Sequence, residues 1–405
     1  RAPAGTARMK PLAINALSTV NALGLGLEET ARALKESRSG LRRCDYEDAK
    51  LDTFIGRAEG VELTPIAGDL ARFDCRNNRL GLMALRADGF AASVAGAIER
   101  YGAGRIALIL GTSTSGVREG ERAFARRSAE TGALPKDFRF AETHDHHSLA
   151  TFAQSYLGLE GPAITVSTAC SSSAKVFADA AQLIEADVCD AAVVGGADSL
   201  CLLTLYGFKS LELTADTPCC PNDTARAGIS IGEAAGFALL ERADMAGDGT
   251  AAMLLGYGES ADAYHMSAPH PDGLGAELAM RMALERAGLA PGRVDYINQH
   301  GTGSRQNDQS EDAAIARVFG DGMRCSSTKG ATGHTLGAAG ILEIAICCLA
   351  MRDGFIPGNV NLRTLDPDFR CHVEAAATAG AIDHALTNSF GFGGSNCSIL
   401  LGRRA

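Results

Sequence analysis

One cysteine lies where a predicted strand meets a predicted helix, in the stretch TVSTACSSSAK at residues 165–175. The β-branched run at 164–166 predicts a buried strand, and apolar residues at helical spacing predict a helix over 172–186. Cys170 therefore falls at a helix N-terminus, where unpaired N–H groups and the helix dipole favour the thiolate, the reactive form of cysteine. These features predict a nucleophile. The alternative is an inert, buried cysteine at the start of a core helix.

Three further stretches place polar residues between glycines at strand ends: NQHGTGS at 298–304, STKGATGHTLG at 327–337 and NSFGFGG at 388–394. Loops at such positions are where binding and catalytic residues concentrate. Taken singly, His300 and His334 are more often satisfied surface or core residues, Lys329 is more often solvated, and Phe392 is more often core. Together with Cys170 they form a candidate site.

Strands and helices alternate along the elements that must hold these turns. We expect strands at 105–110, 164–166, 191–197, 253–257, 294–298, 324–328 and 397–401. We expect helices at 27–35, 78–100, 118–130, 172–186, 274–287, 310–318 and 336–351. Residues 40–75 are polar and irregular. Such alternation predicts parallel sheets covered by helices on both faces, and hence an α/β fold.

Length and composition bound the function classes. A chain of 405 residues with 46% hydrophobic and 21% charged residues predicts a soluble protein of two domains or two fused halves. No uninterrupted apolar run approaches about 18 residues, so we expect no membrane span. The net charge of −10 argues against broad nucleic-acid binding. Residues 1–8 precede Met9 and are expected to be a leftover of cloning; nothing there resembles a signal peptide.

The twelve cysteines include no CxxC pair at zinc spacing, and two adjacent pairs are poorly suited to structural disulfides. This usage predicts a reduced, cytoplasmic protein. The stretch THDHH at 143–147 has no standard zinc spacing, and Asp145 fits a helix cap, so we expect no metal there. The glycine-rich turns lack the strand-GxGxxG-helix context of a dinucleotide site.

In this order, Cys170, His300-Gly-Thr, Lys329-x-x-x-Gly-His334 and Gly-Phe392-Gly-Gly resemble the β-ketoacyl-acyl-carrier-protein synthases of the thiolase superfamily. The bacterial elongating (FabB/FabF-like) condensing enzymes are the most similar class, in register from about residue 10 to 402. The resemblance implies a five-layered αβαβα fold of two pseudo-symmetric halves, 9–250 with the nucleophile and 251–405 with the histidines. It also implies a homodimer, with the strand at 191–194 close to the dimer axis.

The resemblance implies an acyltransferase, a 3-oxoacyl-acyl-carrier-protein synthase of class EC 2.3.1. Cys170 would accept an acyl chain from a phosphopantetheine thioester. His300 and His334 would stabilise the charge that develops as CO2 leaves malonyl carrier protein, and the carbanion equivalent would attack acyl-Cys170. The backbone N–H groups of Cys170 and Phe392 would form an oxyanion hole, with Phe392 also acting as a gate. A lost oxyanion donor costs about 10²–10³ in rate.

Further roles are implied for residues around this set. Lys329 would act by its charge, paired with Glu311. Thr302 and Ser304 would hydrogen-bond the pantetheine arm. No cofactor is expected beyond the phosphopantetheine that carries the substrates.

The implied partner is an acidic acyl carrier protein, which favours docking on arginines. Arg76 and Arg79 lie one helical turn apart and match the family's docking helix. Arg127 would add to this patch, with Arg126 as a further candidate. The alternative is a solvated helix surface.

Other interpretations stay open. A thiolase would need a second cysteine in the loop at 388–394, and acetyl-coenzyme A-primed synthases use His and Asn where this chain has His300 and His334. A partner subunit of a heterodimeric ketosynthase, a chain-length factor, normally lacks the nucleophile. Arg305, Gln306 and the polar stretch at 144–147 depart from housekeeping elongases and suggest a specialised pathway, such as aryl polyene or polyketide-like synthesis.

Overall fold

The computed structural model describes residues 8–404, so the expectation for the first eight residues lies, apart from Arg8, outside the described part of the chain. Within that part, one sheet of 12 strands has the order β14-β12-β11-β16-β17-β10-β1-β9-β7-β5-β6, where β14 is His372–Val373, and β2 (Gly24–Leu25) lies beside β1. The strands of its N-terminal part are β1 (Leu12–Asn21), β5 (Ile106–Gly111), β6 (Ala163–Val166), β7 (Ala191–Asp198) and β9 (Ala234–Arg242). Those of its C-terminal part are β10 (Ala252–Ala261), β11 (Tyr296–Asn298), β12 (Arg324–Ser326), β16 (His384–Gly391) and β17 (Ser395–Gly402).

The two parts have the same topology. When the five strands of each part are numbered in chain order, their spatial order is 3-2-4-5-1 in both. In both parts the second strand lies parallel to the third and fourth, and the fifth lies antiparallel to the fourth and first. The parts join where residues 12–14 pair with residues 252–254. This is the pseudo-symmetric pair of halves that we expected.

The sheet is mixed, whereas the alternation of elements predicted parallel sheets. The antiparallel pairs involve the fifth strands and β1, which pairs with β2 and β10. The tight turn Phe392–Gly394 connects β16 to β17, and so short a connection permits only antiparallel pairing. The prediction of parallel pairing holds for β5, β6, β7, β11, β12, β14 and β16.

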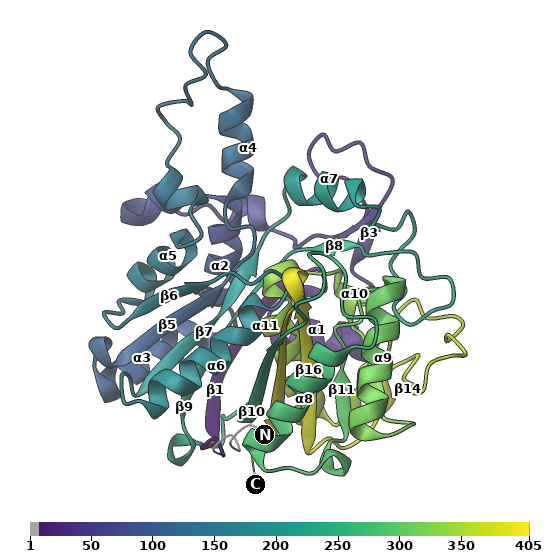
Figure 1. Ribbon diagram of the computed structural model, residues 1–405. Helices are drawn as coiled ribbons and strands as arrows, with labels where there is room; N and C mark the ends of the chain where they lie inside the picture. The colour runs from purple at the N-terminus through teal and green to yellow at the C-terminus, as the bar shows by residue number, and fades with distance from the viewer. Residues whose placement is uncertain (1–7, 405) are drawn as a thin grey trace.

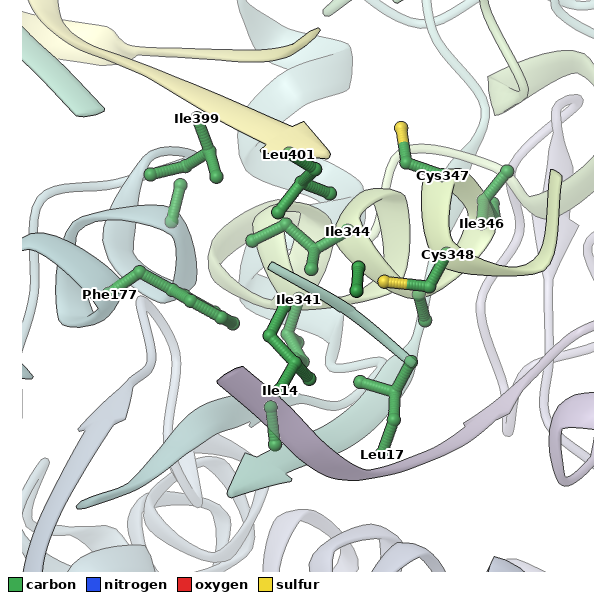
Figure 2. Close-up of a cluster of buried hydrophobic side chains, with 14 of the residues drawn as sticks. Ile14, Leu17, Phe177, Ile341, Ile344, Ile346, Cys347, Cys348, Ile399 and Leu401 are labelled. Carbon is green, nitrogen blue, oxygen red and sulfur yellow. The ribbon is translucent and has the colours of Figure 1, made fainter. Parts of the chain in front are cut away.

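Two helices form the central layer: α6 (Ser172–Glu185) and α11 (Ala339–Asp353). Residues 339–351 of α11 are all buried, as expected for a helix that is apolar on every side. Figure 2 shows Ile341 and Ile344 of α11 among Ile14, Phe177 and Leu401, which come from both halves of the chain. The central helices are therefore one core shared by the two halves.

The two parts of the sheet both pack against α6 and α11 and count as two β layers. The outer helices complete the five layers (Figure 1). Helices α2 (Arg76–Arg86), α3 (Phe90–Tyr101) and α5 (Ser148–Leu157) cover the N-terminal half, and α8 (Leu274–Ala287) and α9 (Arg305–Phe319) cover the C-terminal half. The remaining helices are α1 (Leu27–Lys35), α4 (Val117–Ala125), α7 (Leu202–Ser210) and α10 (Lys329–Thr332). The remaining strands are β2 (Gly24–Leu25), β3 (Leu41–Arg43), β4 (Phe54–Gly56), β8 (Ile231–Gly232), β13 (Phe355–Ile356), β14 (His372–Val373) and β15 (Thr378–Ala379).

The helix predicted at 78–100 is in fact two helices, α2 and α3. They meet at Ala87–Gly89, where Asp88 has a left-handed backbone with φ of 55°. By length and composition alone, Arg76–Tyr101 could cross a membrane, and 44% of its most apolar window is buried in the fold. The break and the buried Arg76 fit a core element of this protein better.

The strand at 191–194, expected near the dimer axis, belongs to β7, which pairs with β5 and β9 on its two sides, and its distance from that axis stays a prediction. The free edge of this half belongs to β6, where Ile164 is 38% exposed. Figure 1 shows α4 and the loop after it projecting from the body on the same half. All twelve cysteines are free thiols.

Candidate active site

The turn that carries Cys170 is tight. Ala169 has a left-handed backbone with φ of 53°, and Ser172 Oγ donates a hydrogen bond of 2.6 Å to the carbonyl of Ala169. Thr168 N–H donates to the same hydroxyl at 2.9 Å. Small residues allow this sharp passage from β6 to α6, and the strained backbone is typical of functional sites. Cys170 is thereby held at the start of the central layer, 5% exposed.

The structure brings the predicted histidines to this cysteine. His334 Nε2 lies 3.1 Å from Cys170 Sγ, and the rings of His300 and His334 are 5.2 Å apart and nearly perpendicular. One nitrogen or sulfur atom from each of the three residues lies within 4.8 Å of the others, a spacing that a metal ion could also use. The predicted constellation of a thiol and two imidazoles is thus present.

The protonation of Cys170 differs from our expectation. Burial raises the pKa of its thiol to about 12, although the charge of Lys329 and the N–H of Phe392 act in the opposite direction. Desolvation thus outweighs the helix N-terminus, and the resting group is a thiol at neutral pH. Burial and the charge of Lys329 also hold the pKa of His334 well below its ordinary value. A neutral imidazole at 3.1 Å is then the acceptor available for the thiol proton.

The predicted ion pair of Lys329 with Glu311 does not form. Lys329 is buried and pairs with Glu343 of α11. Glu311 accepts hydrogen bonds from the backbone N–H groups of His300 and Gly301, each at 2.8 Å, and from a side-chain amide at 3.0 Å. Its carboxylate is therefore occupied in holding the His300 turn. Burial raises the pKa of Glu311 and of Glu343 to about 7.

Sequence reasoning missed Glu343. The signal was available, because Glu343 is the lone acidic residue within the otherwise apolar stretch 336–351. An ionisable group in the middle of a buried helix requires a partner. Lys329, at the first position of α10, is that partner.

Lys329 also selects the form of His300. Its Nζ lies 3.5 Å from His300 Nδ1. Because an ammonium group only donates, Nδ1 must accept, and the proton of the neutral ring resides on Nε2. Burial and Lys329 keep the pKa of His300 well below its ordinary value, so the ring stays neutral. His300 thus offers an N–H donor away from Lys329.

A single pocket joins these groups to the surface. Its walls include Cys170, His300, His334, Thr302, Ser304, Phe208 and Phe392. Thr302 Oγ1 and Ser304 Oγ lie 3.0 Å apart along one wall, so the structure places both residues predicted to bind pantetheine beside the predicted nucleophile.

Phe392 lies at the mouth of the site within a glycine turn. Its N–H is directed at Cys170, and its ring lies 5.4 Å from that of Phe208. Gly393 and Gly394 have φ of 80° and 76°, which permits the reversal of the chain. Gly393 N–H donates to the carbonyl of Met266 at 2.8 Å. Phe392 and Cys170 therefore line the same pocket.

The predicted docking patch is only partly available. Arg76 is 4% exposed and forms ion pairs with Glu233 and Glu62, so it cannot meet a partner; this prediction was wrong. The reason is that Glu233, buried beside it, requires a cation. Arg79 is half-buried and forms a two-point contact with Asp74. Arg127 is exposed.

Two histidines of the stretch 144–147, His144 and His147, contact different side chains. The ring of His144 stacks on Phe140 at 5.1 Å, and His147 Nδ1 lies 2.8 Å from Thr165 Oγ1 on β6. These contacts give the two rings different partners.

Comparisons with known proteins agree with this site. The profile of the "Beta-ketoacyl synthase, N-terminal domain" matches residues 9–246, and that of the C-terminal domain matches residues 251–363. The 3-oxoacyl-acyl-carrier-protein synthase 2 of Vibrio cholerae is 31% identical over 96% of this chain and 98% of its own. The same-named protein of Rhizobium meliloti is 41% identical over 60% of this chain, a match that spans 62% of that relative.

Among solved structures, the ketosynthase ApeO in complex with its chain length factor ApeC, from Xenorhabdus doucetiae, superimposes with a TM-score of 0.88. The identity is 38% over 98% of each chain. These matches cover both halves and the turns that carry the site. The chain therefore belongs to the β-ketoacyl synthase family and has its thiolase-like fold.

Proposed function

We propose that the chain is a β-ketoacyl-acyl-carrier-protein synthase that condenses malonyl carrier protein with an acyl group held on Cys170. The observation that carries this proposal is a buried thiol 3.1 Å from a neutral imidazole, with a second neutral imidazole beside it. Cys397, the cysteine nearest the glycine turn in sequence, is buried in β17 and is not part of the pocket wall, which disfavours a thiolase.

In the first half-reaction, Cys170 passes its proton to His334 Nε2 and its sulfur attacks the acyl thioester. The tetrahedral oxyanion lies within reach of the N–H groups of Cys170 and Phe392. Collapse of the intermediate breaks the bond to the pantetheine sulfur, which leaves with the proton. Acyl-Cys170 remains in the pocket.

In the second half-reaction, malonyl carrier protein occupies the same pocket. His300 Nε2–H donates to the thioester oxygen. Because acyl-Cys170 no longer offers a proton, His334 presents an Nε2–H as the second donor. These donors stabilise the enolate as CO2 leaves. The enolate carbon attacks the acyl carbonyl, the bond to Cys170 breaks, and a 3-ketoacyl product two carbons longer is released. The Cys170 sulfur leaves as a thiolate and takes up a proton from water, which restores the resting thiol.

We also propose how the chain is organised and what it contacts. The boundary between 9–250 and 251–405 is supported by the equal strand order of the two halves. The free edge of β6 and the projecting α4 support a dimer through the N-terminal half, with a second copy or with a related subunit. Arg79 and Arg127 remain candidates for carrier-protein docking. Twelve free thiols fit a cytoplasmic location.

Polar residues favour a specialised product over a plain alkyl chain. Arg305 and Gln306 line a groove beside the pocket, and Gln306 also lines the pocket itself. His147 contacts the sheet edge at Thr165. Polyene or aryl polyene chains are candidate substrates. Turnover of octanoyl and dodecanoyl carrier proteins at equal and high rates would contradict this part of the proposal.

Intact-mass analysis tests the proposed reaction. The protein is incubated with octanoyl carrier protein and then with malonyl carrier protein. An adduct on Cys170 that becomes a 3-ketoacyl product supports the proposal. An adduct without product, with activity restored by a related subunit, supports the second candidate, a partner subunit that shapes product length. Absence of both adduct and malonyl decarboxylation contradicts both.

A further inference from the structure

A carboxylate outside the predicted set is the hub of the turns around Cys170. Asp198, the last residue of β7, is fully buried. Its partners are hydroxyl and backbone N–H groups. They include Thr112 Oγ1 at 2.6 Å, Thr114 Oγ1 at 2.9 Å and the N–H of Ser113 at 2.9 Å. Gly337 N–H donates to its other oxygen at 2.6 Å. So many donors hold a buried carboxylate without a cation.

These donors belong to two turns that flank the nucleophile. The first comes directly after β5, and Thr112 N–H there also donates to the carbonyl of Val166 at 3.1 Å, at the end of the strand that leads to Cys170. The second is the turn from His334 to Gly337, which begins the central helix. Asp198 thus connects the strand end before Cys170 to the turn of His334.

The His334 turn is strained and closely packed. Leu336 has φ of 51°, a conformation that branched side chains rarely adopt. A Cβ on Gly337 would lie 2.6 Å from Asp198 Oδ2 and 2.7 Å from the nitrogen of Ser113. A strained turn persists only where its surroundings hold it in place. Asp198 holds the backbone of this turn at Gly337, and the carbonyl of Ser230 holds it at His334, whose N–H donates at 2.7 Å.

We propose that Asp198 is a positioning residue of the condensation reaction, which holds the His334 turn and the 112–114 turn in the geometry that Cys170 requires. This inference rests on the proposed function. Asp198 acts through His334, since its oxygens are occupied by the two turns. An aspartate suits the position because both of its oxygens accept hydrogen bonds and every partner offers an N–H or O–H group.

Asp198→Asn is the sharpest substitution. It keeps the size of the side chain but replaces one acceptor by an NH2 group, which then faces N–H donors. We expect kcat for condensation to fall about 10²-fold, the size of effect that small misplacements produce, while KM for malonyl carrier protein stays within about threefold. Asp190→Asn is the matched control, since Asp190 lies just before β7 and pairs with Arg105 near the surface.

A second measurement does not depend on turnover. In protein labelled with ¹⁵N-histidine, the ring signals of His334 are assigned by their loss in His334→Ala. We expect Asp198→Asn to shift these signals and Asp190→Asn to leave them unchanged. Asp198→Asn combined with His334→Ala should cost less than threefold more in kcat than His334→Ala alone.

Unchanged kcat and unchanged ring signals in a folded Asp198→Asn variant would overturn the inference, even if its melting temperature fell. If Asp198→Asn does not fold, Ser113→Ala removes one hydroxyl donor. A loss of at least threefold in kcat at constant KM then supports the role, and no loss overturns it. If the parent forms no 3-ketoacyl product, the proposed function fails, and the ring signals alone decide the role of Asp198.

Discussion

The two halves of the molecule share a strand order but differ in the segment that connects the third strand to the central helix. In the N-terminal half, β6 leads through a short turn directly to Cys170 and α6. In the C-terminal half, β12 leads to α11 through α10 and a longer turn. Lys329 is the first residue of α10, and His334 lies in the turn that follows. The same topology therefore brings both turns to one central layer. Turn length and residue type then give one half the nucleophile and the other the proton-handling groups.

The two connecting segments also differ in the ionisable side chains that they carry. Around Cys170 the short turn is made of hydroxyl and small side chains, with bonds such as Ser172 Oγ to Ala169 O. The C-terminal half buries Lys329, Glu343 and Glu311 in one region. Hydroxyl groups can satisfy a tight turn locally, whereas buried charges require partners from other elements. Substitutions in the two connecting segments should therefore have different effects on rate and on stability.

The largest effect is expected for the nucleophile of the N-terminal half. Cys170→Ala should reduce condensation by more than about 10⁴-fold, because no other thiol is placed to carry the acyl chain. Malonyl decarboxylation should persist, since the C-terminal half is intact. Product and CO2 are measured in parallel. Cys397→Ala is the control, and an equal loss there would favour thiolase-type chemistry.

The imidazoles of the C-terminal half come next. His300→Ala and His334→Ala should each reduce malonyl decarboxylation about 10²–10³-fold, the usual cost of a lost oxyanion donor. His300→Ala should still acylate Cys170, whereas His334→Ala should acylate it slowly because the thiol proton loses its acceptor. Adduct formation is followed by intact mass. His372→Ala, at a side chain 61% exposed, should behave as the parent. Equal acylation by both variants would contradict the division of roles.

The buried ion pair of Lys329 and Glu343 should affect the stability of the protein and the rate of condensation separately. Lys329→Met leaves Glu343 buried without a partner and should lower the free energy of unfolding by about 3–5 kcal/mol. The double variant Lys329→Met/Glu343→Leu should regain most of that stability, since neither charge remains. Its kcat should stay low, because His300 loses the group that selects its tautomer. Urea unfolding and initial rates check this. Recovery of kcat in the double variant would show that Lys329 acts only in folding.

The titration of Glu343 should change the free energy of unfolding by less than the loss of Lys329 does. The pKa of Glu343 is raised from 4.5 to about 7 by burial, so between these values the folded state holds more protons than the unfolded state. This group therefore adds stability at pH 5 that is lost as pH rises to 7. The difference in unfolding free energy between parent and Glu343→Gln should change by about 2–3 kcal/mol over that window. A constant difference would show that the carboxylate is ionised throughout.

Docking is expected to give the smallest effect. Arg127→Glu should raise KM for carrier-protein substrates several-fold and leave reactivity with acyl-coenzyme A unchanged, because the exposed charge acts on encounter. Arg76→Glu should instead destabilise the protein, since it would bury a third carboxylate beside Glu233 and Glu62. Arg43→Glu, at another exposed arginine, serves as the control. An unchanged KM in Arg127→Glu would show that the carrier protein does not dock at Arg127.

The sequence predicted this site unevenly, and the reasons are physical. Cys170, His300 and His334 were predictable because glycine turns and ordered motifs are local features. The bounds of α1 and α8 were also predicted as observed, since apolar spacing and end signals agree there. The partner of Lys329, the burial of Arg76 and the hub at Asp198 were not predicted. Each of these three features depends on which elements, distant in the sequence, pack together in the fold. An ion pair between such elements produces no regular spacing of residues in the sequence.

The pairing of Lys329 with Glu343 has a consequence for the substrate. A malonyl carboxylate that enters the pocket meets no lysine or arginine among the described residues of its wall, because Lys329 is buried and paired with Glu343. Its own negative charge is then removed from water without a compensating cation, which is costly. Loss of CO2 relocates that charge to an enolate oxygen that faces N–H donors. By pairing Lys329 with Glu343, the protein leaves the bound carboxylate without a cation, and loss of CO2 moves the charge to an oxygen that N–H donors stabilise.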